Sequence, residues 1–258
     1  MRRQHTYDQD WERLAQAEPM WAVLTDERYR SIRLTPESEK AFWQSGEAYV
    51  RHVGNLCTTH FGRPLAPHRA LDFGCGVGRL LVPLARLSGE AVGVDASPTM
   101  LAHARSACDR AGLSNVSFLP SLPTQGAFDL VNSALVLQHI PVPSGLFLLD
   151  RLLACLAPGG LLAIQVLFSR PGNRPLRRAG RWLYANLRPL RWLANRWLGT
   201  AGNAPYMQMN AYPLDLVFRK LYASSVSDLH VILTSQNDFA SALIVGAKHD
   251  RAAQTGPT

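Results

Sequence analysis

Three glycines at alternate positions, Gly74, Gly76 and Gly78, follow an apolar run in the stretch ALDFGCGVGRL, residues 70–80. An apolar segment continues to residue 87, so the pattern predicts a strand, a tight glycine turn and a helix. Glycine is needed where the backbone adopts unusual dihedral angles, or where a ligand approaches the main chain more closely than a Cβ atom allows. The stretch therefore predicts a nucleotide-like ligand at the turn.

The residues around the turn narrow the choice of ligand. A dinucleotide fingerprint, G-x-G-x-x-G, needs its third glycine at position 79, which is Arg79. Asp72 lies two residues before the first glycine, where its charge repels a pyrophosphate but favours a ligand with an ammonium and a sulfonium group. S-adenosylmethionine (SAM) is such a ligand. Asp95 ends a second apolar run, where an α/β nucleotide site places the acid that accepts both ribose hydroxyls.

Four segments in order resemble the class I SAM-dependent methyltransferases of the small-molecule type. They are the glycine stretch, VGVDASPTML (92–101), FDLVNSALVLQHIP (128–141) and LLACLAPGGLLAIQ (152–165). A plain strand-to-helix turn is the alternative for the glycine stretch alone, but it does not account for four segments in this spacing. The resemblance covers residues 69–168 and implies SAM as the cofactor.

The apolar segments alternate as in a doubly wound, mostly parallel α/β sheet of seven strands, the Rossmann-like methyltransferase fold. Strands are expected at 69–73, 91–95, 116–119, 128–132 and 161–167, and helices at 79–87, 98–111 and 144–156. A helix near 214–221 and strands near 229–233 and 240–247 follow, and in the resembled family the last two strands form an antiparallel end to the sheet.

The order of these segments suggests five regions. They are an N-terminal helical cap (1–66), a SAM-binding core (67–168), a basic amphipathic helical insertion or lid after the fifth strand (169–206), a C-terminal helix with closing strands of the same domain (207–249) and a disordered tail (250–258). In the cap, Thr35 and Pro36 predict a helix start. FWQSGE, residues 42–47, resembles the family's substrate-pocket wall, with plain core packing as the alternative.

The resemblance implies a set of cofactor-binding residues. The turn residues Gly74, Cys75, Gly76 and Gly78 would cradle the methionine part of SAM beside Asp72. Asp95 would bind the ribose, although it could instead act as an ordinary cap for the helix that starts after Ser97. The further candidates are Ala96 and Met100 beside the adenine, Ser121 and the Leu122 backbone in place of an acid that this sequence lacks after its third strand, and Asn132 and Gln138. Met100 suits the core equally well.

His139 is the candidate catalytic residue. SAM has an activated leaving group, so the protein supplies alignment, desolvation and, for a hydroxyl acceptor, a base. Neutral imidazole accepts a proton near pH 7, and His139 lies just beyond the fourth strand. The alternative is a histidine that only fixes the turn at Ile140 and Pro141. No metal site is expected, because the four cysteines have no C-x-x-C spacing, and a reducing cytoplasm is the natural compartment.

We therefore expect O-methylation of a metabolite, sugar or natural product. The alternatives are a lipid-like acceptor at a membrane and a SAM-binding protein without catalysis. The segment NSAL, residues 132–135, differs from the [N/D]-P-P-[Y/F] run of enzymes that methylate exocyclic amines of bases.

The net charge of +8 is concentrated in one segment. Residues 170–196 contain eight arginines, and no acidic residue occurs between Asp150 and Asp215. Three interpretations compete for this segment: a lid over the substrate, peripheral contact with an anionic membrane through residues 174–198, and, ranked last, nucleic-acid binding. The uncharged run at 152–169 is interrupted by Pro158, Gly159 and Gly160, which favours a helix, turn and strand over a membrane span.

Overall fold

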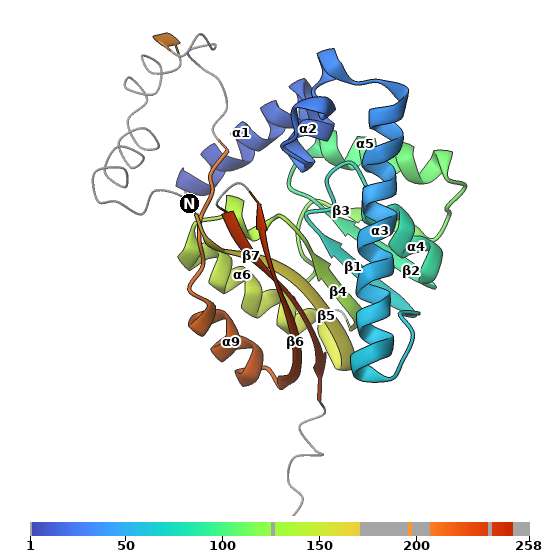
Figure 1. Cartoon of the computed structure of the whole chain (residues 1–258), viewed down its shortest axis with the longest axis vertical. Coiled ribbons are helices and arrows are strands. Elements are labelled where there is room, and N and C mark those ends of the chain that lie inside the picture. The colour runs from blue at the N-terminus through green and yellow to red at the C-terminus, as the bar shows by residue number, and fades with distance from the viewer. Residues whose placement is uncertain (1, 125–126, 171–195, 198–206, 237–238, 250–258) are drawn as a thin grey trace, which may run out of the picture.

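The computed structural model describes residues 2–124, 127–170, 196–197, 207–236 and 239–249 of the 258-residue chain. A seven-stranded sheet with the order β3-β2-β1-β4-β5-β7-β6 forms its centre (Figure 1). The parallel strands are β1 (Arg69–Phe73), β2 (Glu90–Val94), β3 (Val116–Leu119), β4 (Phe128–Ser133) and β5 (Leu156–Ser169). The antiparallel strands are β6 (Val226–Gln236) and β7 (Phe239–Lys248). The predicted fold class, mostly parallel with an antiparallel end, is confirmed.

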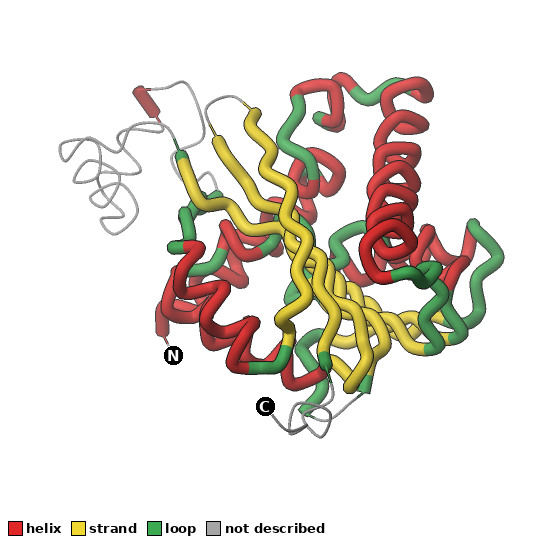
Figure 2. Tube along the Cα trace, turned by 60° about the horizontal axis from the view of Figure 1, so that its bottom comes forward, coloured by secondary structure: helices red, strands yellow, loops and turns green. Residues whose placement is uncertain are grey.

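Helices cover both faces of the sheet because the strand residues alternate between two apolar cores (Figure 2). Leu71, Val131 and Ile164 face α6 (Val142–Cys155) and α9 (Leu214–Ala223). Ala70 and Leu130 face the opposite way. That second face is covered by α3 (Pro36–Phe61), α4 (Leu81–Leu87) and α5 (Pro98–Arg110).

The N-terminal helices are α1 (Arg2–Ala17) and α2 (Pro19–Val23), followed by the short 3₁₀ helices η1 (Glu27–Tyr29) and η2 (Ser31–Arg33). The helix start predicted at Thr35 is confirmed: its Oγ1 accepts a hydrogen bond from the Ser38 amide at 3.2 Å, and Ser38 Oγ accepts one from the Thr35 amide at 2.9 Å. This reciprocal pair satisfies two amides that the helix itself leaves unpaired.

Several predicted boundaries are wrong, among them the helix expected from residue 144, which begins at Val142. The helix expected from residue 79 begins at Leu81, because Gly78 has a φ of +90° and the chain is still turning there. The strand expected from residue 161 begins at Leu156, which pairs with Phe128 before the register between β4 and β5 shifts. The predicted tail and most of the predicted insertion lie outside the described residues.

Candidate functional site

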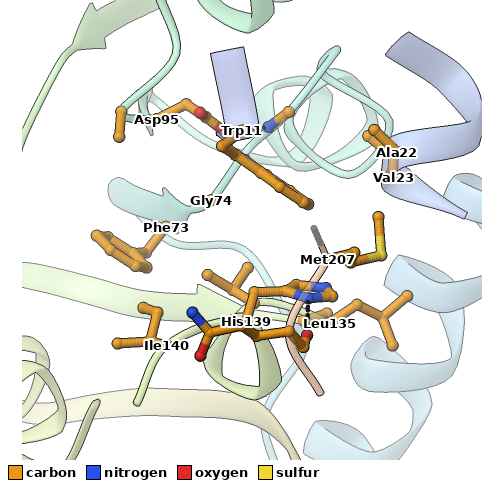
Figure 3. A pocket seen from close by; sticks show the side chains of 15 residues that line it. Trp11, Ala22, Val23, Phe73, Gly74, Asp95, Leu135, His139, Ile140 and Met207 are labelled. Carbon is orange, nitrogen blue, oxygen red and sulfur yellow. Dashed lines mark hydrogen bonds between the residues drawn. The ribbon is translucent and has the colours of Figure 1, made fainter. Parts of the chain in front are cut away.

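A hollow opens where β1, β2 and β4 end, the edge at which doubly wound sheets bind ligands (Figure 3). It encloses about 940 Å³, part of it open to solvent. Five parts of the chain line it: the N-terminal helices, the end of β1 with the glycine turn, the residues after β2, the loop after β4 and residues 207–208. The lining residues are Trp11, Ala22, Val23, Phe73, Gly74, Gly76, Asp95, Ala96, Ala134, Leu135, Val136, His139, Ile140, Met207 and Gln208.

The glycine turn directs its N–H groups into the protein. The amides of Gly74 and Cys75 donate to the Val94 carbonyl at 2.7 and 3.0 Å. The Gly76 amide donates to Asp95 Oδ2 at 2.9 Å, and the Gly78 amide donates to the Cys75 carbonyl at 2.9 Å. A phosphate-binding turn points such donors at its ligand. These four amides are therefore not available to an anion in the hollow.

Each glycine of the turn has a left-handed φ, but their surroundings differ. A Cβ on Gly74 would lie 2.2 Å from Val136 Cγ2, and one on Gly76 would lie 2.7 Å from Val23 Cγ2. A Cβ on Gly78 would instead lie 3.2 Å from the Cα of Ala104 in α5. Gly74 and Gly76 therefore allow two lining side chains, Val136 and Val23, to pack against the turn, whereas Gly78 allows α5 to pack against it.

Asp95 lies at the end of β2 with both carboxylate oxygens hydrogen-bonded to backbone. Oδ2 accepts from the Gly76 amide, and Oδ1 accepts from the Ser97 amide at 2.9 Å. Burial raises the pKa of Asp95 to about 6, although these two bonds act in the opposite direction. Each oxygen retains a second lone pair, so the carboxylate can still accept hydroxyl donors from a ligand. Ser97 itself caps α5, accepting from the Met100 amide at 3.0 Å.

Asp72 lies behind the turn in a buried polar network. Asn132 Nδ2 donates to Asp72 Oδ1 at 2.7 Å, and the Tyr49 hydroxyl donates to Asn132 Oδ1 at 3.2 Å. Oδ2 of Asp72 is buried and has no hydrogen-bond partner among the described residues. Burial raises the pKa of Asp72 to about 6, against the effects of Asn132 and Arg79. Such an unpaired buried oxygen is costly unless a ligand donates to it.

Arg79, which breaks the dinucleotide fingerprint, is buried beside this network. Its Nη1 donates to Ser45 Oγ at 3.2 Å, and its positive charge lowers the pKa of Asp72 against the larger effect of burial. A Cβ on Gly46 would lie 2.1 Å from the Arg79 carbonyl oxygen, so α3 packs directly on this residue. Residues 42–47, which resemble a substrate-pocket wall, thus contact Arg79 and the core and are not part of the lining.

His139 ends the 3₁₀ helix η3 (Leu137–His139) in the loop after β4. Its Nδ1 lies 2.8 Å from the Gln208 carbonyl oxygen, which can only accept, so we assign the ring hydrogen to Nδ1 and the lone pair to Nε2. Burial lowers the pKa of His139 to about 4, although the Gln208 and Leu135 carbonyl groups act in the opposite direction. The ring is therefore neutral at pH 7.

The α1 helix places Trp11 in the hollow, where its ring centroid lies 5.0 Å from that of His139 (Figure 3). The neighbouring Glu12 holds α1 to the start of α5: its Oε2 accepts from Ser97 Oγ and its Oε1 from Thr99 Oγ1, both at 2.5 Å. No motif marks Trp11 in the sequence, because it lies in the polar segment DQDWER. Sequence reasoning also missed Val23, Leu135 and Met207.

Residues 70–160 match a family described as a methyltransferase domain. This segment contains β1 to β4, the glycine turn, Asp95 and His139. The matching segment is part of a larger fold, because the same sheet continues beyond it through β5, β7 and β6. The class I methyltransferase resemblance seen in the sequence is thereby confirmed.

Curated relatives of the chain carry the name ubiquinone biosynthesis O-methyltransferase. The protein from Nitrobacter winogradskyi is 35% identical over 132 residues, which cover 50% of this chain and 48% of that protein. The protein from Chelativorans sp. is 33% identical over 156 residues, covering 57% and 58%. The chain thus spans about half the length of these relatives.

Solved structures share the fold of this chain at low sequence identity. The N-methyltransferase NodS from Bradyrhizobium japonicum, in complex with S-adenosylhomocysteine (SAH), superposes with a TM-score of 0.58 at 17% identity, covering 95% of this chain and 100% of that one. Magnesium protoporphyrin IX methyltransferase from Synechocystis, with bound SAH, gives 0.55 at 19%, covering 81% and 86%.

The fold brings some of the predicted site residues together and leaves others outside the hollow. Gly74, Gly76, Asp95, Ala96 and His139 line it. Asp72 and Cys75 are buried close to the turn, and Asn132 contacts Asp72.

The remaining predicted residues lie elsewhere. Met100 is fully buried among core side chains, Gly78 packs against α5, and Leu122 is buried in the core under α6. Ser121 is exposed, and Gln138 contributes its backbone carbonyl to a contact with Asn210. Among the residues that the structure describes, no group of His, Cys, Asp or Glu side chains is arranged to hold a metal ion.

Proposed function

We propose that this protein transfers the methyl group of SAM to a hydroxyl group of a largely apolar small molecule. The observation that carries the proposal is a glycine turn whose amides bond within the protein, between two buried carboxylates. A phosphate ligand would meet negative charge there without the four amide donors. A ligand with an ammonium, a sulfonium and two ribose hydroxyls meets acceptors instead. The names of the structural neighbours, which were solved with SAH, support the same cofactor.

The residues at the turn fit SAM in kind. Asp95 has lone pairs left for the ribose hydroxyls, and Asp72 Oδ2 is a buried acceptor without a partner. Gly74 and Gly76 line the hollow without a side chain, so the ligand chain can approach their backbone. Ala96, which is exposed at the rim, is our candidate neighbour of the adenine.

His139 is the proposed general base. When bound, SAM supplies a methyl group on a sulfonium leaving group. Nε2 of His139 takes the proton of the acceptor hydroxyl, so that the oxygen can form its new bond to the methyl carbon. The neutral state of the ring at pH 7 suits this role, since an imidazolium could not accept a proton. Trp11 and Ile140 exclude water around the ring.

The walls of the hollow suggest the class of acceptor. Trp11, Val23, Leu135, Ile140 and Met207 are apolar, and Asp95 is the one charged side chain among the lining residues that the structure describes. Such walls favour an uncharged hydroxyl compound, because an acceptor with a carboxylate or phosphate would lose its hydration without gaining a cation. The relatives' name, which specifies O-methylation, supports a hydroxyl acceptor.

The test is transfer of a labelled methyl group from SAM to an alkyl phenol and to its carboxylated analogue. We expect methylation of the alkyl phenol alone, and loss of roughly 10- to 100-fold in SAM affinity in Asp95→Asn, because an amide replaces a charged acceptor. Asp109→Asn, on the exposed side of α5, is the matched control. SAH binding without transfer to a broad set of hydroxyl compounds would instead indicate a SAM-binding protein without catalysis.

We further propose peripheral contact with anionic membranes through residues 174–198, which lie largely outside the described residues. The support is the sequence alone: eight arginines between residues 170 and 196 without an acidic residue. No helix in the described part of the chain is long and apolar enough to cross a bilayer. Co-sedimentation with anionic but not neutral vesicles, lost when these arginines are changed to glutamine, would support the contact.

A further inference from the structure

The stretch 208–212, here called the splint, runs beside the loop that carries His139. Asn210 bonds to the Gln138 carbonyl oxygen twice, through its amide at 2.7 Å and its Nδ2 at 3.1 Å. The Tyr212 hydroxyl donates to the Ile140 carbonyl oxygen at 2.8 Å. Between these contacts, the Gln208 carbonyl oxygen meets His139 Nδ1. Three consecutive loop residues are thus bonded to a segment about 70 residues later in the chain.

Tyr212 anchors the splint in the core. Its side chain is 2% exposed, and its amide donates to the Leu167 carbonyl oxygen of β5 at 2.8 Å. A Cβ on Gly145, in the first turn of α6, would lie 1.8 Å from the Tyr212 hydroxyl oxygen. The glycine therefore lets the hydroxyl reach Ile140, and the ring has little freedom to move.

We propose that Tyr212 and Asn210 are positioning residues for His139. By holding the carbonyl groups on either side of it, they keep the Gln208 carbonyl against Nδ1 and leave Nε2 as the nitrogen with the lone pair. The neutral side chain of free histidine prefers to carry its hydrogen on Nε2, so the splint imposes the opposite tautomer. Only the role of Nε2 as the base rests on the proposed function; the positioning of the ring and its tautomer do not.

The charged and titratable groups around His139 are few among the described residues. Asp95 lines the same hollow, and the hydroxyl of Tyr212 donates its hydrogen to the Ile140 carbonyl oxygen. From α1, the uncharged Trp11 faces the ring while Glu12 is bonded to Ser97 and Thr99. Arg170 donates to the Met209 carbonyl. The ring therefore stays neutral because it is enclosed, and loosening the splint would admit water and raise its pKa toward the ordinary value near 6.5.

The experiment is ¹⁵N NMR of histidine-labelled full-length protein, with the His139 signals assigned through His139→Gln. We expect the wild type to show the Nδ1–H tautomer of a neutral ring throughout pH 5.5 to 7.5. Tyr212→Phe and Asn210→Ala should each populate both tautomers and raise the pKa of His139. The matched control is Tyr222→Phe, which removes a hydroxyl from a tyrosine that is 75% exposed on α9 and should change nothing.

Activity provides a second readout. Tyr212→Phe should lower kcat roughly tenfold through misplacement of the base, with SAH affinity unchanged and the acid limb of the pH–rate profile moved upward. An Nε2–H tautomer in the wild type would overturn the proposal, as would an unchanged tautomer and pKa in both folded variants. If the tautomer is as expected but His139→Gln retains full activity, the positioning role stands and the base role fails.

Discussion

Asp72 and Asp95 are carboxylates with raised pKa values, both about 6, at a site proposed to bind a cation. A bound ammonium and sulfonium favour the ionised forms, so binding releases protons wherever the carboxylates of the free protein are partly protonated. We expect the affinity for SAM to increase as the pH rises from 5 to 7 and then to level off.

Calorimetry across this pH range measures the effect directly. The observed heat should depend on the ionisation enthalpy of the buffer below pH 6.5, as proton release requires. Asp95→Asn should flatten part of the profile. An affinity that falls as the pH rises would contradict the assignment of a cationic ligand.

Comparing alanine substitutions at Gly74 and at Gly112, which follows α5, separates the cost of backbone strain from the cost of a steric clash. Both have similar positive φ values, +73° and +68°, but a Cβ on Gly112 would meet no atom within 4 Å. Gly112→Ala should therefore cost about 1 kcal/mol of unfolding free energy from strain alone. Gly74→Ala should cost about 2 to 4 kcal/mol, because it also collides with Val136. Urea denaturation of both variants tests this, and equal losses would show that Val136 gives way freely.

At the scale of elements, α1 is held over the site by the packing of Leu14 and Ala15 and by the carboxylate of Glu12. Glu12 accepts short hydrogen bonds from the hydroxyl groups of Ser97 and Thr99 at the start of α5. We expect Glu12→Gln to reduce SAH affinity roughly tenfold, because a charge-assisted contact of about 1.5 kcal/mol or more no longer keeps Trp11 in the hollow.

Hydrogen exchange of the α1 amides should accelerate in the same variant, since the helix opens more often. Glu39→Gln, in the first turn of α3, is the control and should leave both measurements unchanged. Unaltered SAH affinity in Glu12→Gln, despite faster exchange, would separate α1 from the cofactor site.

Local sequence patterns predicted the elements that carry the cofactor side of the site. The backbone conformation of the apolar run before Asp95 and of the glycines after Phe73 depends on residues close in sequence. Their geometry therefore follows from short-range sterics. The acceptor side comes from contacts across long separations. Trp11 and Tyr212 contact the loop after β4 from opposite ends of the described chain, and no local sequence pattern predicts these contacts.

Some residues within the motifs lie away from the hollow. Gly78 belongs to the glycine pattern, yet α5 packs against it and the hollow does not reach it. Met100 follows the predicted ribose acid and lies in the core. A motif shows at which positions the side chain must be small or apolar. Only the packing of the folded chain shows which neighbouring atoms impose that requirement.

For the molecule as a whole, we propose that the sheet holds a cationic methyl donor and that the flanking segments enclose the acceptor. The two carboxylates, the inward-facing amides and the neutral His139 all depend on the same edge of the sheet.

The most direct measurement is calorimetry of the full chain at pH 7.5 with SAM, SAH and NAD in parallel. The account predicts saturable binding of SAM and SAH at one site per chain, weakened in Asp95→Asn, and no heat with NAD. Clear binding of NAD without binding of SAM or SAH would contradict it.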